Sequence, residues 1–149
     1  MCIRDSRITW GFVSGAESAS AKFALEKRLK LESPPLIAMG DAPDKPDPQG
    51  FLYLASKLCE RSLGDENIPI AYVGDTIADI NTVSNAKKRI PSQKFISIGV
   101  APPHLHLESR MKERISYESK LKEAGADLIL NTVNDLKNID IDFFKKLQE

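Results

Sequence analysis

The chain alternates short apolar runs with longer amphipathic ones, and this pattern restricts it to few folds. The alternation is typical of strands and helices in a mainly parallel sheet that helices cover on both faces. No short run shows the strict polar and apolar alternation of a strand with one solvated face. We therefore predict an α/β fold of three layers, Rossmann-like, with strands at 8–14, 35–39, 70–74, 95–100 and 127–131.

Helices are predicted between and after these strands, at 17–31, 48–63, 77–89, 106–124 and 140–148. In the fourth helix we expect the apolar side chains of Leu107, Met111, Ile115 and Leu121 to share the face that packs on the sheet. No linker, repeat or low-complexity tract interrupts the chain, so we expect one domain with one core across residues 7–149.

Residues 1–6 read "MCIRDS", a prefix that recurs in gene models assembled from environmental sequencing reads. We treat this segment as non-native and exclude it from the fold prediction. The native protein is then expected to begin upstream of residue 7.

Composition argues against several classes of partner. The 21 basic and 21 acidic residues balance and are scattered, so we expect no nucleic acid and no membrane as partner. No apolar stretch approaches the ~20 residues of a spanning helix. The two cysteines, Cys2 and Cys59, lack CxxC or zinc-ligand spacing, which indicates a reducing compartment and a cytoplasmic location. The oligomeric state stays open.

Polar residues follow the first two predicted strands, where an open parallel sheet binds its ligands. Ser14 is expected to end the first strand, with Gly15 beside a helix start, and a hydroxyl near free N–H groups suits phosphate oxygens or, more simply, caps the helix. After the second strand comes "GDAPDKPDPQGF", in which Lys45 precedes Pro46. This stretch is either a surface loop or a firmly held lysine that points into a site. Its acids are three residues apart, which does not match a calcium loop.

The third predicted strand runs into "VGDTIADI", which places Asp75 in the turn and Asp79 about one turn into the next helix. An N-terminal cap would explain Asp75 or Thr76, but it explains Asp79 poorly. Two neighbouring carboxylates repel unless a cation or a proton lies between them. We therefore favour a magnesium site at Asp75 and Asp79 over a cap, since Mg²⁺ commonly takes one or two carboxylates plus water.

The order of "FVSG", "DKPDP" and "YVGDTIADI" resembles the second, third and fourth motifs of the haloacid dehalogenase superfamily, the aspartate-dependent phosphohydrolases. The resemblance covers about residues 8–131. It implies a magnesium-dependent, phosphatase-like hydrolase of a small phosphorylated metabolite. Ser14 and Gly15 would bind the phosphoryl group, Lys45 would stabilise the charge of nucleophile and phosphate, and Asp75 and Asp79 would hold Mg²⁺.

The first motif of that superfamily, a DxDx(T/V) loop with the nucleophile and the general acid and base, is absent from the chain. In the family its strand lies at the centre of the sheet, between those that here carry Ser14 and Asp75, and a helical cap commonly follows it. We therefore interpret the chain as a carboxy-terminal fragment without nucleophile, central strand or cap. As such it should be marginally stable and inactive on phosphate esters. A non-catalytic α/β binding or regulatory module with a degenerate site is the alternative.

One further pair could bind metal. His104 and His106 form an H-x-H pair of the kind that chelates zinc. No third ligand has a suitable spacing, so we favour a loop near the site over a zinc centre.

Overall fold

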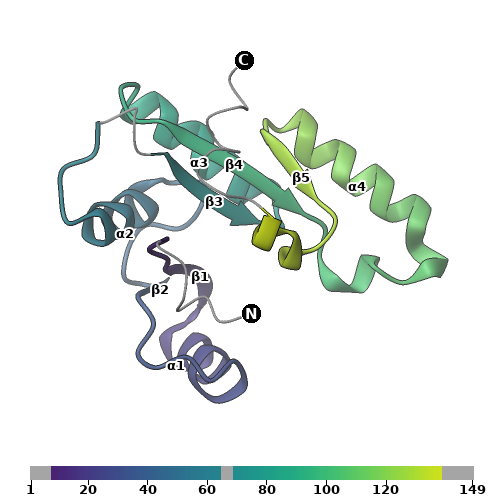
Figure 1. Ribbon diagram of the computed structural model, residues 1–149, viewed down its shortest axis with the longest axis horizontal. Helices are drawn as coiled ribbons and strands as arrows, with labels where there is room; N and C mark the ends of the chain where they lie inside the picture. Colours follow the sequence, from purple (N-terminus) through teal and green to yellow (C-terminus); the bar gives the residue numbers. More distant parts are fainter. Residues whose placement is uncertain (1–7, 65–68, 139–149) are drawn as a thin grey trace. The chain divides into compact units, whose positions relative to one another are not determined.

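The computed structural model describes residues 8–64 and 69–138, which divide into two compact units, one up to Leu63 and one from Gly64 (Figure 1). Each unit has its own open parallel sheet, with the order β1-β2 in the first and β3-β4-β5 in the second. The α/β class with parallel strands is thus confirmed. The helix predicted at 140–148 and the prefix at 1–6 lie outside the described residues.

In the first unit, β1 (Phe12–Glu17) pairs with β2 (Leu36–Met39). A single helical segment joins them, as α1 (Ser18–Lys22) and a π-helix (Phe23–Arg28). The predicted helix at 17–31 is therefore present, but its second half is wound with π-type hydrogen bonds, such as that from Leu29 N to Ala24 O.

Helix α2 (Gln49–Cys59) covers the sheet of the first unit through close contacts at two glycines. A Cβ at Gly50 would lie 3.1 Å from Ile37 Cγ2 of β2, and one at Gly11 would lie 3.1 Å from Leu54 Cδ2 of α2. The absence of side chains at these two positions lets helix and strands approach each other.

The first strand is shifted from its prediction. It was expected at 8–14, yet β1 begins at Phe12 and continues to Glu17. The pairing of β1 with β2 is irregular between Val13 and Glu17. These two residues are four positions apart, whereas their partners in β2, Ile37 and Met39, are only two positions apart. The strand therefore contains a bulge built from Ser14, Gly15 and Ala16, which are small enough to allow it.

The second unit begins with β3 (Ile70–Gly74), α3 (Ile77–Arg89) and β4 (Phe95–Val100). Two short 3₁₀ turns (Pro103–Leu105 and Glu108–Arg110) lead into α4 (Met111–Glu123), which is followed by β5 (Leu128–Leu130) and a further 3₁₀ helix (Val133–Asn138). All six residues of β4, the central strand of this sheet, are buried. None of the helices in the described ranges is long and apolar enough to span a membrane.

The sheet of the second unit carries apolar clusters on both faces. On one face, Ile96, Ile98 and Leu130 form a core onto which Val73 and Leu128 pack. On the other face, Ile80 of α3 and Leu121 of α4 are fully buried together with Ala126, and Ile129 packs against them. Alternate side chains along a strand point to opposite faces, which is why β5 supplies both clusters, with Leu128 and Leu130 in the first and Ile129 in the second.

The prediction that Leu107, Met111, Ile115 and Leu121 share one packed face is wrong. Leu121 is fully buried, whereas the other three side chains are about 60% exposed. Six residues of α-helix turn through about 600°, so Ile115 and Leu121 cannot share a face. Leu107 also precedes the helix, since α4 begins at Met111. Leu121 is instead the buried residue of α4, and the partly buried Tyr117, together with Ala124 at the C-cap, packs against the same cluster.

Candidate functional site

The best-defined site geometry lies at the carboxyl end of β3, where Asp75 and Thr76 form the turn into α3. Thr76 is the N-cap of α3 and forms a capping box with Asp79. Asp79 N donates to Thr76 Oγ1 (3.2 Å), while Thr76 N and Thr76 Oγ1 donate to Asp79 Oδ2 (3.0 and 2.7 Å). The expectation that a cap explains Asp79 poorly is therefore wrong, because this carboxylate completes the cap.

Asp79 is also the most buried acid among the residues that the structure describes in the second unit. Its side chain is only 3% exposed, and the hydroxyl of Tyr72 in β3 donates to its Oδ1 atom (3.1 Å). Three hydrogen bonds thus occupy most of the roughly four acceptor positions of a carboxylate. The backbone of β3 comes equally close, since a Cβ built on Gly74 would lie 2.2 Å from the Cβ of Asp79. Asp79 is therefore a fixed part of the turn.

Asp75 differs from Asp79 in both burial and contacts. It is half-buried, and the described ranges 8–64 and 69–138 contain no hydrogen bond or ion pair to its carboxylate. Its main-chain carbonyl accepts a hydrogen bond from the hydroxyl of Tyr117 in α4 (2.7 Å). The main chain at Asp75 is thus held from a second element, while its side-chain oxygens remain available.

Burial and the neighbouring acids raise the pKa values of both Tyr72 and Tyr117. Burial and the charges of Asp79 and then Asp75 raise the pKa of Tyr72 far above its ordinary value. Burial, followed by the charges of Asp75 and Asp79, also raises the pKa of Tyr117. The negative charges of both acids therefore act on both hydroxyls, which places the two carboxylates in one electrostatic environment. Both tyrosines remain protonated donors at neutral pH.

This arrangement fits a hard cation with one direct protein ligand. Mg²⁺ prefers oxygen ligands, keeps several waters and is usually held by one or two carboxylates. Asp75 supplies an available carboxylate at the carboxyl end of a parallel strand, and Asp79 adds a buried negative charge beside it. Within the part of the chain that the structure describes, no three Asp, Glu, His or Cys side chains gather into a larger metal-binding group.

Ser14 and Gly15 lie in the bulge of β1, so the predictions that Ser14 ends the strand and that Gly15 adjoins the helix start are wrong. The strand ends at Glu17, and α1 begins at Ser18. Ser14 Oγ accepts a hydrogen bond from Ala16 N (3.1 Å), which turns the main chain locally. Gly15 is exposed, and a Cβ there would meet nothing within 4 Å. The bulge thus leaves open space beside the main chain at Gly15.

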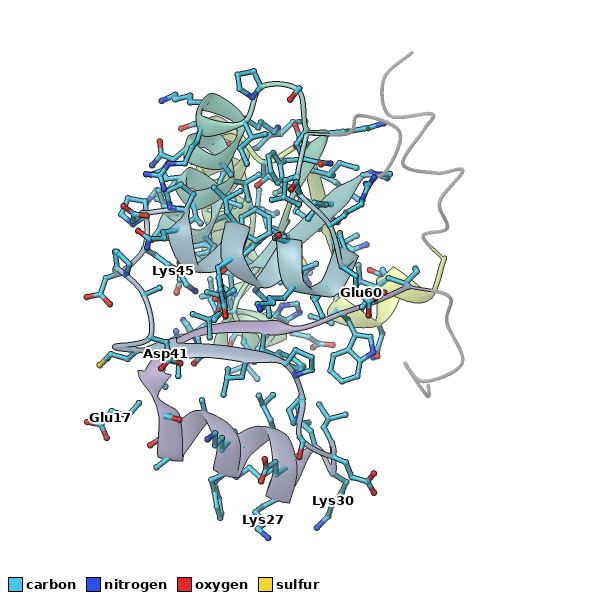
Figure 2. All side chains as sticks on the ribbon, turned by 90° about the vertical axis from the view of Figure 1, so that its left-hand side faces the viewer. Glu17, Lys27, Lys30, Asp41, Lys45 and Glu60 are labelled. Atoms are coloured by element: carbon cyan, nitrogen blue, oxygen red, sulfur yellow. The ribbon has the colours of Figure 1, made fainter. Side chains whose placement is uncertain are left out.

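Lys45 lies in the loop between β2 and α2, in which acidic side chains bind main-chain N–H groups. Asp41 Oδ2 accepts from Ala38 N (2.8 Å), and Asp47 Oδ1 accepts from Gln49 N at the start of α2 (2.8 Å). Lys45 is half-buried and precedes a cis peptide bond to Pro46. Figure 2 shows Glu17, Asp41 and Lys45 on one side of the first unit, whereas Glu60 lies at the opposite end of α2. Lys45 therefore belongs to the edge at which β1 and β2 end.

The four predicted site residues are thus divided between the units: Ser14 and Lys45 in the first, Asp75 and Asp79 in the second. Sequence reasoning named Thr76 as a possible cap but missed the part of Asp79 in that cap, and it missed the roles of Tyr72 and Tyr117. The spacing of Thr76 and Asp79 matches a capping box and could have revealed the first. No local pattern connects Tyr117 with Asp75, which is 42 residues away.

The histidine pair has an ordinary structural setting. His106 Nε2 lies 2.8 Å from the carbonyl oxygen of Ala101, in the loop that follows β4, and His104 is exposed. The contact places His106 in a local loop interaction.

Comparison with known proteins supports the fold. No protein-family model matches the chain, and no curated protein does. Among solved structures, the chain is similar to the crystal structure of a phosphonoacetaldehyde hydrolase-like protein from Oleispira antarctica, with a TM-score of 0.62 and 20% sequence identity. The match covers 85% of this chain and 47% of that chain, so the chain spans about half the length of the structure it matches. The chain therefore has a haloacid dehalogenase-like, Rossmann-type fold.

Proposed function

We propose that the chain is part of a magnesium-dependent, phosphatase-like hydrolase that acts on a small phosphorylated metabolite. The main observation in support is the half-buried Asp75 carboxylate, which is available at the carboxyl end of β3 beside the buried Asp79. Ligands of open parallel sheets bind at this end of the strands. The similarity to a hydrolase-like structure supports the fold on which the proposal relies.

In this proposal Asp75 binds the cation directly and Asp79 contributes its charge from within the cap. When bound, Mg²⁺ would neutralise charge on the phosphoryl oxygens, which phosphoryl transfer requires more than covalent help from the protein. Lys45 would add a second positive charge. The hydroxyl of Ser14 and the open main chain at Gly15 would receive phosphoryl oxygens.

The nucleophile is proposed to lie in a segment upstream of this chain. Two observations support this: the chain spans about half of the similar structure, and its strands divide into two sheets between β2 and β3. In the described residues β1 and β3 belong to different sheets, as expected if the strand that normally lies between them is missing. The alternative of a non-catalytic module predicts instead a genuine start codon beside Arg7.

Direct metal binding by the chain tests the cation site. Mn²⁺ would be titrated into the chain and followed by water-proton relaxation, with Mg²⁺ as competitor. We expect Asp75→Asn to weaken Mn²⁺ binding more than about 10-fold, since a close charge pair is worth up to ~4 kcal/mol at an effective dielectric near 20. The matched control is Glu108→Gln, which removes an exposed carboxylate of the same unit and should leave binding unchanged.

Activity requires the upstream reading frame. A chain extended to include a DxDx(T/V) motif should hydrolyse p-nitrophenyl phosphate only with Mg²⁺, and Asp75→Asn should abolish this. Because the similar structure is described as phosphonoacetaldehyde hydrolase-like, phosphonoacetaldehyde belongs in the same assay. Activity that persists in Asp75→Asn would remove Asp75 from the cation site, and inactivity of the extended chain towards every phosphorylated substrate would favour the non-catalytic module.

A further inference from the structure

A hydrogen bond from α4 reaches the acidic turn after β3. The hydroxyl of Tyr117 donates to the main-chain carbonyl of Asp75 at 2.7 Å, although the two residues are 42 positions apart. The ring of Tyr117 packs against the cluster of Ile80, Leu121 and Ala126. Since this cluster is formed by α3, α4 and the turn before β5, the position of the hydroxyl is set by the core of the second unit.

Of the two acids at this turn, the bond acts on the one whose side chain has no hydrogen bond or ion pair within the described residues. Asp79 is fixed by its own three hydrogen bonds, whereas the Asp75 carboxylate has no partner in the described residues. The direction of the Asp75 side chain is therefore set by the main chain that carries it. A donor on the Asp75 carbonyl restricts rotation of the peptide unit, which limits the orientations of that side chain.

We propose that Tyr117 is a positioning residue for the cation site, and that its hydroxyl holds Asp75 in a metal-binding orientation. This inference rests on the proposed function, because it requires Asp75 to bind the cation. Groups that orient a metal ligand without touching the metal typically change metal affinity 10- to 100-fold. Tyr117 acts through the main chain and by one hydrogen bond, so we expect a smaller effect, about 3- to 10-fold.

Tyr117→Phe tests the hydroxyl alone, because the ring and its packing remain. Mn²⁺ titrations of the parent chain, Tyr117→Phe and Asp75→Asn would be compared with the melting temperature of each variant without metal. We expect Tyr117→Phe to bind Mn²⁺ about 3- to 10-fold more weakly than the parent. A purely structural role would lower the melting temperature and leave the affinity of the folded protein unchanged.

Two control variants separate positioning from general loosening of α4. Arg114→Gln breaks the contacts of Arg114 with Glu118 (2.6 Å) and with the carbonyl of Asn131 (3.1 Å), and neither contact involves the acidic turn. It should lower the melting temperature without weakening Mn²⁺ binding. Tyr53→Phe removes the hydroxyl of an exposed tyrosine and should change neither quantity.

The outcomes distinguish the two proposals. If the parent binds no Mn²⁺, or if Asp75→Asn binds as well as the parent, the cation site is wrong and the role of Tyr117 is overturned with it. If Asp75→Asn loses binding but Tyr117→Phe does not, or if Arg114→Gln loses as much as Tyr117→Phe, only the role of Tyr117 is overturned. If Tyr117→Phe does not fold, the parent chain carrying ¹³C at tyrosine Cζ would be titrated with Mg²⁺ and followed by NMR. The chemical shift of the Tyr117 signal should change with the same midpoint as metal binding, and an unchanged shift would overturn the inference.

Discussion

Replacement of Gly74 by alanine should strongly destabilise the second unit, because β3 and α3 meet there without room for a side chain. The added Cβ would lie 2.2 Å from Asp79 Cβ, 2.6 Å from its Cγ and 2.8 Å from its Oδ2. The first of these atoms is attached directly to the main chain, so no change of rotamer moves it away. Ordinary contact begins at 3.4 Å, so the backbones of β3 and α3 must separate by about 1 Å.

The expected loss in the free energy of unfolding follows from what that separation breaks. Overpacking costs about 1–3 kcal/mol, loss of a cap adds about 0.5–2 kcal/mol, and a weakened hydrogen bond from Tyr72 to a charged carboxylate adds a similar amount. We expect about 2–7 kcal/mol in total, against a stability of roughly 5–15 kcal/mol for a typical domain. Gly74→Ala should therefore remove a large part of the stability of the second unit.

Urea denaturation followed by far-ultraviolet circular dichroism measures this loss. Gly15→Ala is the matched control, because a Cβ at Gly15 meets nothing within 4 Å, and it should change the stability by less than about 0.5 kcal/mol. The amide signal of Thr76, which donates to Asp79, should move in Gly74→Ala and stay in place in Gly15→Ala. A Gly74→Ala protein within 1 kcal/mol of the parent would refute the reasoning, since the turn would then tolerate the displacement.

Two further predictions concern stability. Tyr72 keeps its proton in the folded chain at pH values where the unfolded chain loses it near its ordinary pKa of about 10, so stability should fall by up to ~1.4 kcal/mol per pH unit above pH 10. Urea denaturation between pH 9 and pH 11 should show a shallower fall for Tyr72→Phe, and equal slopes would contradict the raised pKa of Tyr72. Leu121→Ala should cost about 2–5 kcal/mol, whereas Ile115→Ala, at an exposed position of the same helix, should cost less than about 0.5 kcal/mol. Similar losses for the two variants would show that the exposed face of α4 is covered in solution.

Strands β3, β4 and β5, together with α3, were predictable from the sequence to within about one residue. Their apolar runs are continuous, and the pattern of Thr76 and Asp79 marks the helix start. The course of β1 was not predictable, because a bulge of Ser14, Gly15 and Ala16 depends on pairing with β2 rather than on local preference. The packed face of α4 was misjudged because Ile115 and Leu121 are six residues apart, a spacing that places them on different faces of a helix, and because Leu107 precedes the helix.

The candidate site, too, was predictable only where local sequence patterns define it. Short spacings placed Asp75 and Asp79 at one turn, which the structure confirms. The difference between the fixed Asp79 side chain and the available Asp75 side chain depends in part on Tyr72 and Tyr117. Their hydroxyls contact the turn only in the folded unit. Periodicity describes neighbours along the chain and carries no information about a contact between residues 42 positions apart.

The capping box at Thr76 and Asp79 has a consequence for reading distant sequences. Because Asp79 is needed to begin α3, selection for folding alone would retain it after a descendant had lost its catalytic chemistry. An aspartate at this position would then persist in inactive relatives, and its presence would say little about turnover. The acid at position 75, which no fold requirement in the described residues protects, should be the first to drift and hence the more informative of the two.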